Sequence, residues 1–252
     1  MSVEPFLRDP VKYLNSPQYN KGNGLLINLS GPGGALPDNA QPINVPDPDN
    51  RYAKFRRMPV HMIRAETVSQ YIKLTTGPWS LDISPNPSAG TKTVPSYYLN
   101  WAPDKACAMR LGQSANAFFT APLNGCAILI NGDRASPTVV HANITIGDIL
   151  PAPPSFDSSV TGPYEKEKMA LFYQYYLNLG TGLVDGGVFT GTSGTTQMFD
   201  PLLYYKYQGG KAKVFGLRQP DGWTFYYSME QRVSPTSIKY LSGQLWPKLA
   251  TP

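Results

Sequence analysis

The alternation of apolar and polar residues predicts a chain built mainly of short β-strands. Between residues 79 and 84 every second side chain is apolar, a pattern typical of a strand that buries one face. Near the C-terminus, Gly209-Gly210 and residues 219–222 separate three apolar runs at the spacing of an antiparallel meander. By the same criteria we expect strands over residues 25–29, 79–84, 97–101, 117–120, 126–130, 138–144, 202–207, 211–217 and 223–229.

A helical pattern occurs in the segment that follows Pro163. Glu165 and Glu167 lie where the dipole of a first helical turn favours acidic side chains. Apolar and aromatic residues between 169 and 177 then recur at spacings of three and four, and Gly180 is expected to end the helix. The predicted fold class is therefore α+β, mainly an antiparallel β-sandwich with flanking helices.

The first part of the chain is rich in proline and glycine, with few residues in any regular pattern. We expect residues 1–58 to form an extended N-terminal arm packed on the body of the protein. Residues 59–252 are expected to form the main domain.

The composition indicates a folded protein and excludes a chain that is intrinsically disordered throughout. Of the 252 residues 41% are hydrophobic, including 10 Phe, 16 Tyr and 4 Trp, which is enough to fill a core. Charged residues make up 15% of the chain, against ~25% in an average soluble protein. The net charge of +5 fits an acidic protein, an anionic membrane surface or nucleic acid, and does not choose between them.

The sequence predicts neither a transmembrane segment nor a cleaved signal peptide. No apolar run approaches the ~20 residues that span a bilayer. The N-terminal segment has Glu4 and Pro5 where a signal peptide has basic and then apolar residues. Export would therefore use a route without a cleaved signal, or a larger parent chain.

The chain has few histidines and cysteines, the residues that most often act as nucleophiles, bases or metal ligands. The chain has two histidines, His61 and His141, and two cysteines, Cys107 and Cys126. No CxxC or HExxH pattern is present, and no Walker A lysine follows the glycines at 31–34, so we expect no metal and no cofactor.

The spacing of Cys126 and His141 predicts a pair on neighbouring strands. If the hairpin formed by residues 126–130 and 138–142 is symmetric about Asp133 and Arg134, Cys126 lies directly opposite His141 and shares its face. An imidazolium beside the thiol would favour a nucleophilic thiolate. The alternative is that Cys126 is simply a small hydrophobic residue in an apolar strand. Cys107 has no histidine at hairpin spacing and is expected to be dispensable.

The segment around Cys126 resembles the catalytic segment of toxin glutamine deamidases related to cytotoxic necrotizing factor and Burkholderia lethal factor. The resemblance covers about residues 96–144 and departs from the family at Asn124, where the family motif has serine. The residues that carry it are Phe118, Phe119, Thr120, Leu123, Gly125, Cys126 and His141.

This resemblance implies a catalytic site with Cys126 as nucleophile, His141 as base and Thr120 as the residue that orients His141. The turn at Asn124 and Gly125 would supply N–H groups to an oxyanion. Such an enzyme converts a glutamine of a target protein to glutamate through a thioester, and transglutaminates when an amine replaces water.

The resemblance also implies a biological setting. We expect a bacterial toxin or effector that enters the host cytoplasm and acts there as a monomer on a host protein, without a nucleic-acid partner. Rho-type small GTPases and the RNA helicase of translation initiation are the two target candidates. Two other functions stay open, namely a non-catalytic β-sandwich binding module and a Cys-His peptidase or amidase.

Overall fold

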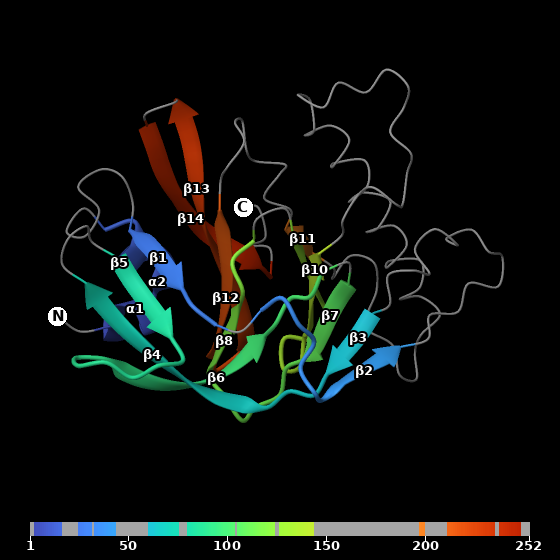
Figure 1. The fold of residues 1–252 in the computed structure, drawn as a ribbon. Helices are drawn as coiled ribbons and strands as arrows, with labels where there is room; N and C mark the ends of the chain where they lie inside the picture. Colours follow the sequence, from blue (N-terminus) through green and yellow to red (C-terminus); the bar gives the residue numbers. More distant parts are fainter. Residues whose placement is uncertain are drawn as a thin grey trace, which may run out of the picture.

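In the residues that it describes, the computed structural model shows a mostly β protein with two short helices (Figure 1). The helix expected after Pro163 and the strand expected over residues 202–207 lie outside the part that it describes. The described residues are 3–16, 25–31, 33–43, 60–75, 80–103, 105–123, 126–143, 197–199, 211–234 and 237–247.

The larger sheet has eight strands, and its neighbours are antiparallel except for the parallel pairs β1–β5 and β6–β8. In spatial order its strands are β1 (Leu26–Leu29), β5 (Ser80–Ser84), β4 (Thr67–Thr75), β6 (Lys92–Leu99), β8 (Ala117–Thr120), β12 (Ala212–Gln219), β13 (Gly222–Ser234) and β14 (Ser237–Trp246).

The smaller sheet has six strands, and β3–β7 is its parallel pair. In spatial order its strands are β11 (Gln197–Phe199), β9 (Ala127–Asn131), β10 (Thr138–Asn143), β7 (Lys105–Arg110), β3 (Val60–Ile63) and β2 (Ala40–Ile43).

One hydrophobic core lies between the two sheets and a second lies on the outer side of the larger sheet. Successive side chains of a strand point to opposite faces, so Phe118 of β8 belongs to the inner core and Phe119 to the outer one. The sheets curve around the inner core toward a nearly closed barrel (Figure 1). The predicted predominance of antiparallel strands is confirmed, whereas these curved sheets do not clearly form the expected sandwich.

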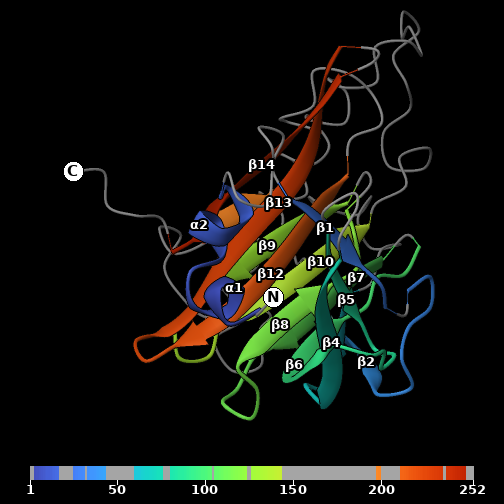
Figure 2. The same ribbon diagram turned by 90° about the vertical axis from the view of Figure 1, so that its left-hand side faces the viewer.

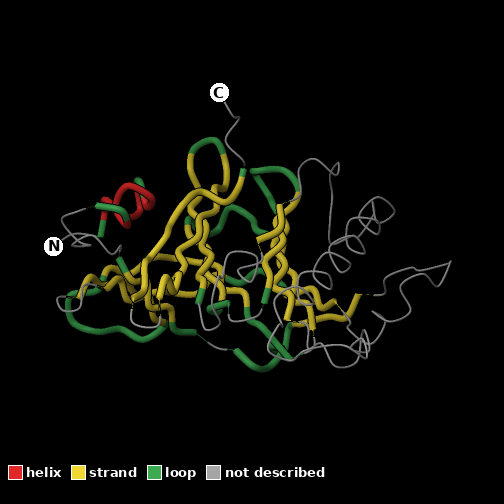
Figure 3. Tube along the Cα trace, turned by 90° about the horizontal axis from the view of Figure 1, so that it is seen from above, coloured by secondary structure: helices red, strands yellow, loops and turns green. Residues whose placement is uncertain are grey.

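Two short helices cover the outer face of the larger sheet (Figures 2 and 3). They are α1 (Glu4–Arg8) and α2 (Pro10–Leu14), each with a proline in its first turn, where the missing N–H costs no hydrogen bond. The Asp9 carboxylate accepts a hydrogen bond from the Lys12 N–H at 3.1 Å and so caps α2. The Phe6 ring packs 5.4 Å from that of Phe215 on β12.

The N-terminal residues take part in both sheets. β1 is the edge strand of the larger sheet and β2 the edge strand of the smaller one. The expectation of an extended arm is wrong for residues 4–14, which are helical because their apolar residues recur at helical spacing and bury Phe6, Tyr13 and Leu14. The domain boundary at residue 58 stays a prediction.

Replacing Phe6 with alanine is expected to lower the free energy of unfolding by about 3–5 kcal/mol, because the ring is fully buried and leaves a cavity. Denaturant titration measures this change. Arg8→Ala, in the same helix but exposed, should stay within about 0.5 kcal/mol of the parent chain. Equal effects of the two substitutions would show that the helix does not anchor the outer core.

Candidate active site

The three side chains predicted for catalysis are buried in the core between the sheets. Thr120 ends β8 of the larger sheet, while His141 lies on β10 of the smaller sheet and Cys126 directly precedes β9. Thr120 is two residues from Phe118 and therefore points to the same inner face. His141 and Thr120 are fully buried, and Cys126 is 7% exposed.

A hydrogen bond between Thr120 and His141 joins the two sheets. The Thr120 Oγ1 lies 2.7 Å from His141 Nδ1 and donates to the carbonyl of Leu99 at 2.8 Å. Leu99 is the register partner of Thr120 in the parallel β6–β8 pair, which brings that carbonyl within reach. The hydroxyl has one proton and gives it to Leu99, so His141 Nδ1 must carry the proton of the second hydrogen bond.

This tautomer leaves the lone pair of His141 on Nε2. Nε2 is buried and has no hydrogen-bond partner among the described residues. Burial lowers the pKa of His141 to about 3, so the imidazole is neutral at physiological pH. The resting site therefore holds a neutral base, not the imidazolium that the sequence suggested.

In the β9–β10 hairpin each residue lies opposite a partner two positions later in the sequence than expected. His141 lies opposite Ile128 and Val139 opposite Ile130, so the prediction that Cys126 directly faces His141 is wrong. Cys126 precedes Ile128 by two residues and belongs to the same inner core as Ile128. It is thus diagonal to His141, a relation in which residues lie about 7–8 Å apart, and no hydrogen bond joins its thiol to His141 Nε2.

The turn between these strands explains the shift. Asp133 Oδ1 accepts a hydrogen bond from the Ala135 N–H at 2.6 Å, and the Asp133 carbonyl accepts one from the Ser136 N–H at 3.0 Å. Arg134 and Ala135 therefore form the corner of the turn, one position later than a corner at Asp133 and Arg134.

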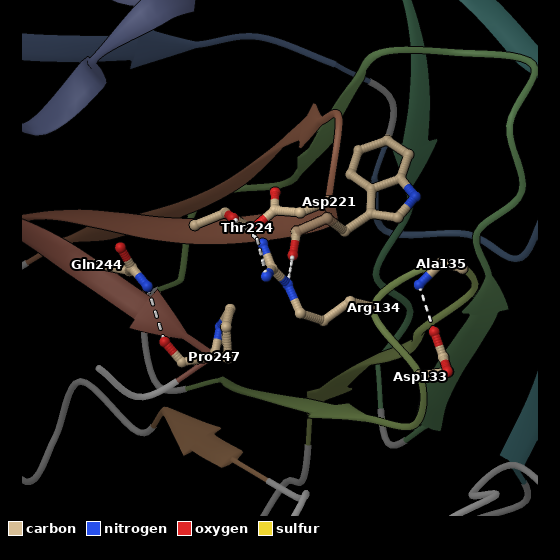
Figure 4. A network of polar contacts seen from close by, with 8 residues as sticks. Asp133, Arg134, Ala135, Asp221, Thr224, Gln244 and Pro247 are labelled. Carbon is tan, nitrogen blue, oxygen red and sulfur yellow. Dashed lines mark hydrogen bonds and ion pairs between the residues drawn. The ribbon is translucent and has the colours of Figure 1, made fainter. Parts of the chain in front are cut away.

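Arg134 attaches this turn to the β12–β13 hairpin (Figure 4). Its guanidinium donates to the Asp221 carboxylate at 2.7 Å, to the Thr224 hydroxyl at 3.2 Å and to the Trp223 carbonyl at 3.3 Å. The Trp223 N–H in turn donates to the Arg134 carbonyl at 2.8 Å. These contacts fix the hairpin that carries His141 against the larger sheet.

Sequence reasoning missed a second cysteine beside His141. Cys107 on β7 lies directly opposite His141 on one side and opposite His61 of β3 on the other. Cys107 thus has a matched histidine through a strand pairing outside the hairpin, and its expected dispensability stays a prediction. No local pattern in the sequence indicates this pairing, since β7 was not among the expected strands.

Burial distinguishes the two thiols. Cys107 has no exposed surface, and burial raises its pKa to about 11, so this thiol stays protonated and weakly nucleophilic. Cys126 retains some exposed surface and lies at the start of β9. The Asn124 and Gly125 residues proposed for oxyanion binding lie outside the described residues, so their role stays a prediction.

The described ranges contain neither a cluster of metal-ligating side chains nor a helix that could cross a membrane. No three side chains of His, Cys, Asp or Glu there lie close enough together to hold a metal ion. The helices in those ranges are all too short or too polar to cross a bilayer.

Comparison with known proteins establishes no family for this chain. No protein-family model matches the sequence, and no curated protein matches it. Among solved structures, the chain is weakly similar to the C-terminal domain of CNFy from Yersinia pseudotuberculosis, with 10% sequence identity and a TM-score of 0.23. The match covers 56% of this chain and 54% of that one, so the chain spans about half the length of its structural relative. A TM-score of this size does not establish a common fold.

Proposed function

We propose that this protein is a glutamine deamidase that acts on a protein substrate through a Cys126 thioester. One observation carries the catalytic part of the proposal: the Leu99–Thr120–His141 hydrogen-bond chain fixes the tautomer that leaves a basic Nε2 among the inner-core side chains that include Cys126. The choice of glutamine as substrate rests on the resemblance of the segment around Cys126 to the toxin deamidases.

The proposed reaction has two stages, formation of the thioester and its hydrolysis. His141 Nε2 takes the proton of the Cys126 thiol as the sulfur attacks the carboxamide carbon, and the carbonyl electrons move onto oxygen. When the carbonyl re-forms, the C–N bond breaks and the nitrogen leaves as ammonia with the proton from Nε2. Water then attacks the thioester, gives a proton to Nε2, and releases glutamate and the free thiol.

Thr120 has a positioning role in this scheme. Its hydroxyl accepts a hydrogen bond from the Nδ1–H group throughout the cycle and keeps the ring from rotating. When Nε2 is protonated, the charge of the imidazolium strengthens this hydrogen bond. The residue thus favours the charged intermediate as well as the resting orientation.

The proposed setting is the cytoplasm of a host cell that a bacterial toxin or effector has entered. A Rho-type GTPase or the RNA helicase of translation initiation is the proposed target, attacked by a monomer without a cofactor. Incubation with host-cell lysate, followed by mass-spectrometric mapping of glutamine-to-glutamate conversions, tests the proposal. A specific conversion that needs Cys126 supports it, whereas shortened target proteins would indicate a Cys-His peptidase and no change would indicate a binding module.

Thr120→Val should slow deamidation by a factor on the order of ten to a thousand, because the ring loses the acceptor that holds Nδ1. Thr120→Ser keeps the hydroxyl and should retain most of the activity. Thr138→Val makes the same change at another buried threonine, on the strand that carries His141, and is the matched control. Steady-state ammonia release measures all three, and full activity in Thr120→Val would exclude the hydroxyl as the orienting group.

A further inference from the structure

Strands β1, β5 and β4 of the larger sheet form the floor of a cavity that is separate from the candidate active site. Its volume is about 470 Å³, which is within the ~300–1,000 Å³ typical of small-molecule sites. Strands β1 and β5 lie on the opposite side of the molecule from β7, β3 and β2 (Figure 1). None of Thr120, Cys126 and His141 lines the cavity, so its role is independent of the proposed deamidation.

The floor of this cavity is polar because the strands alternate. Ile72 of β4 and Ile83 of β5 belong to the outer core, so their chain neighbours Lys73 and Asp82 point to the other face of the sheet. Asp82 is the register partner of both Lys73 and Asn28 of β1, so the three form one row across the strands. All three line the cavity and are partly or fully exposed, which means that the row faces the cavity and not the core.

Hydrogen bonds orient the Asp82 carboxylate within this row. Its Oδ1 accepts from Asn28 Nδ2 at 2.7 Å and from the Ser80 hydroxyl at 3.0 Å. Within the described part of the chain its Oδ2 has no hydrogen-bond partner, and no ion pair joins Asp82 to Lys73. A charged acceptor and a charged donor therefore lie on neighbouring strands, and both are open to a ligand.

An aromatic side chain and a short loop complete the cavity. Tyr71 lies two residues before Lys73 on β4, so it shares the polar face, and it lines the cavity while partly exposed. Residues 85–91 form part of the rim, and the Thr91 hydroxyl donates to the Ser88 carbonyl at 2.8 Å. This hydrogen bond shapes the loop before a ligand binds, which lowers the entropic cost of binding.

The chemistry of these groups narrows the ligand. Asp82 and Lys73 have opposite charges, so the row has no net charge to favour an anion or a cation. A hydroxyl both donates and accepts hydrogen bonds, so two adjacent hydroxyls of a sugar ring can donate to Asp82 and accept from Lys73. Such bonds to charged groups are stronger than those between neutral ones. The Tyr71 ring adds apolar surface, on which the C–H groups of the same sugar can pack.

We propose that this cavity binds a neutral sugar, with adjacent hydroxyls on Asp82 and Lys73 and C–H groups on Tyr71. The probes are immobilised lactose, cellobiose, mannobiose and chitobiose, and a sulfated heparin disaccharide is the charged comparison. The full chain should bind at least one neutral disaccharide saturably and the heparin disaccharide about tenfold more weakly or not at all. Cys126→Ala should bind the sugar like the parent chain, which separates this cavity from the active site.

Variants of the cavity test the assignment of the side chains. Tyr71→Ala and Lys73→Met should each weaken sugar binding by about tenfold or more. Asp82→Asn keeps an oxygen for the hydrogen bonds that orient the side chain but replaces the free oxygen with an N–H donor, and should weaken binding similarly. Tyr240→Ala, at a partly exposed tyrosine on β14, is the matched control and should bind like the parent chain.

Three results would overturn the proposal. They are the absence of binding to all four neutral disaccharides, tighter binding of the heparin disaccharide than of any neutral one, and equal sugar binding by Lys73→Met and the parent chain. The second of these would assign the cavity to anions held by Lys73.

Discussion

Cys126→Ala is expected to reduce glutamine deamidation by a factor on the order of 10⁴ to 10⁶, the size of effect seen when an enzyme loses its nucleophile. Without the sulfur no thioester forms, and the neutral His141 has no nucleophile to activate. The fold should persist, because the side chain is small and lies just before β9. Ammonia release from a glutamine-containing protein measures the activity, and circular dichroism checks the fold.

The matched control for this prediction is Cys107→Ala. Cys107 is also on the inner face and directly opposite His141, so it is the rival nucleophile. Its complete burial and raised pKa argue that it packs and does not react. A folded Cys107→Ala variant should therefore keep most of its activity. If it were as inactive as Cys126→Ala, the nucleophile would be misassigned.

His141→Asn is expected to lower the activity about as far as loss of the nucleophile, since the two residues act as one unit. The asparagine amide can still donate a hydrogen bond to Thr120, so the loss would come from the missing base at Nε2. A fully active His141→Asn enzyme would contradict the mechanism, whichever cysteine carries it.

The same substitution has a predictable effect on acid stability. The pKa of His141 is about 3 in the folded protein, against 6.5 for an unperturbed histidine. As the pH falls from 6.5 toward 3, the unfolded chain binds a proton that the folded chain does not, so the free energy of unfolding falls. The contribution of His141 is about 1.4 kcal/mol per pH unit in that window, and is fully retained above it.

Denaturant titrations of the parent chain and of His141→Asn between pH 7 and pH 4 measure this contribution. The asparagine variant should lose less stability on acidification than the parent chain. Parallel curves for the two proteins would show that His141 already titrates near its ordinary pKa, and is therefore not neutral because of burial.

Local sequence patterns were sufficient to predict some of the strands that pair with their chain neighbours. The alternation at residues 79–84 gives β5, and apolar runs on either side of tight turns give β9 with β10 and β12 with β13. The turn residues predicted the hairpin but not its register, because the hydrogen bonds of Asp133 move the corner by one residue. The strands β2, β3, β4, β7, β11 and β14 were missed. Of these, β3 and β7 pair in parallel across a long stretch of chain, whereas β4 and β14 pair with the neighbouring strands β5 and β13.

The same distinction applies to the candidate site. Cys126 and His141 were selected from the hairpin, and Thr120 came only from the family resemblance. The contact between Thr120 and His141 spans two sheets, so no sequence spacing could have predicted it. The low pKa of His141 likewise results from its burial in the core between the sheets. The pairing of His141 with Cys107 depends on strand β7, which the sequence did not predict.

The most direct test of the proposal is covalent labelling with a chloromethyl ketone analogue of glutamine, followed by peptide mapping. The analogue reacts at the sulfur that attacks the substrate carboxamide and so identifies the nucleophile in the folded protein. We predict one label, on Cys126, formed much more slowly in His141→Asn and absent from Cys107. Labelling of Cys107, or a rate on Cys126 that does not depend on His141, would contradict the proposed site.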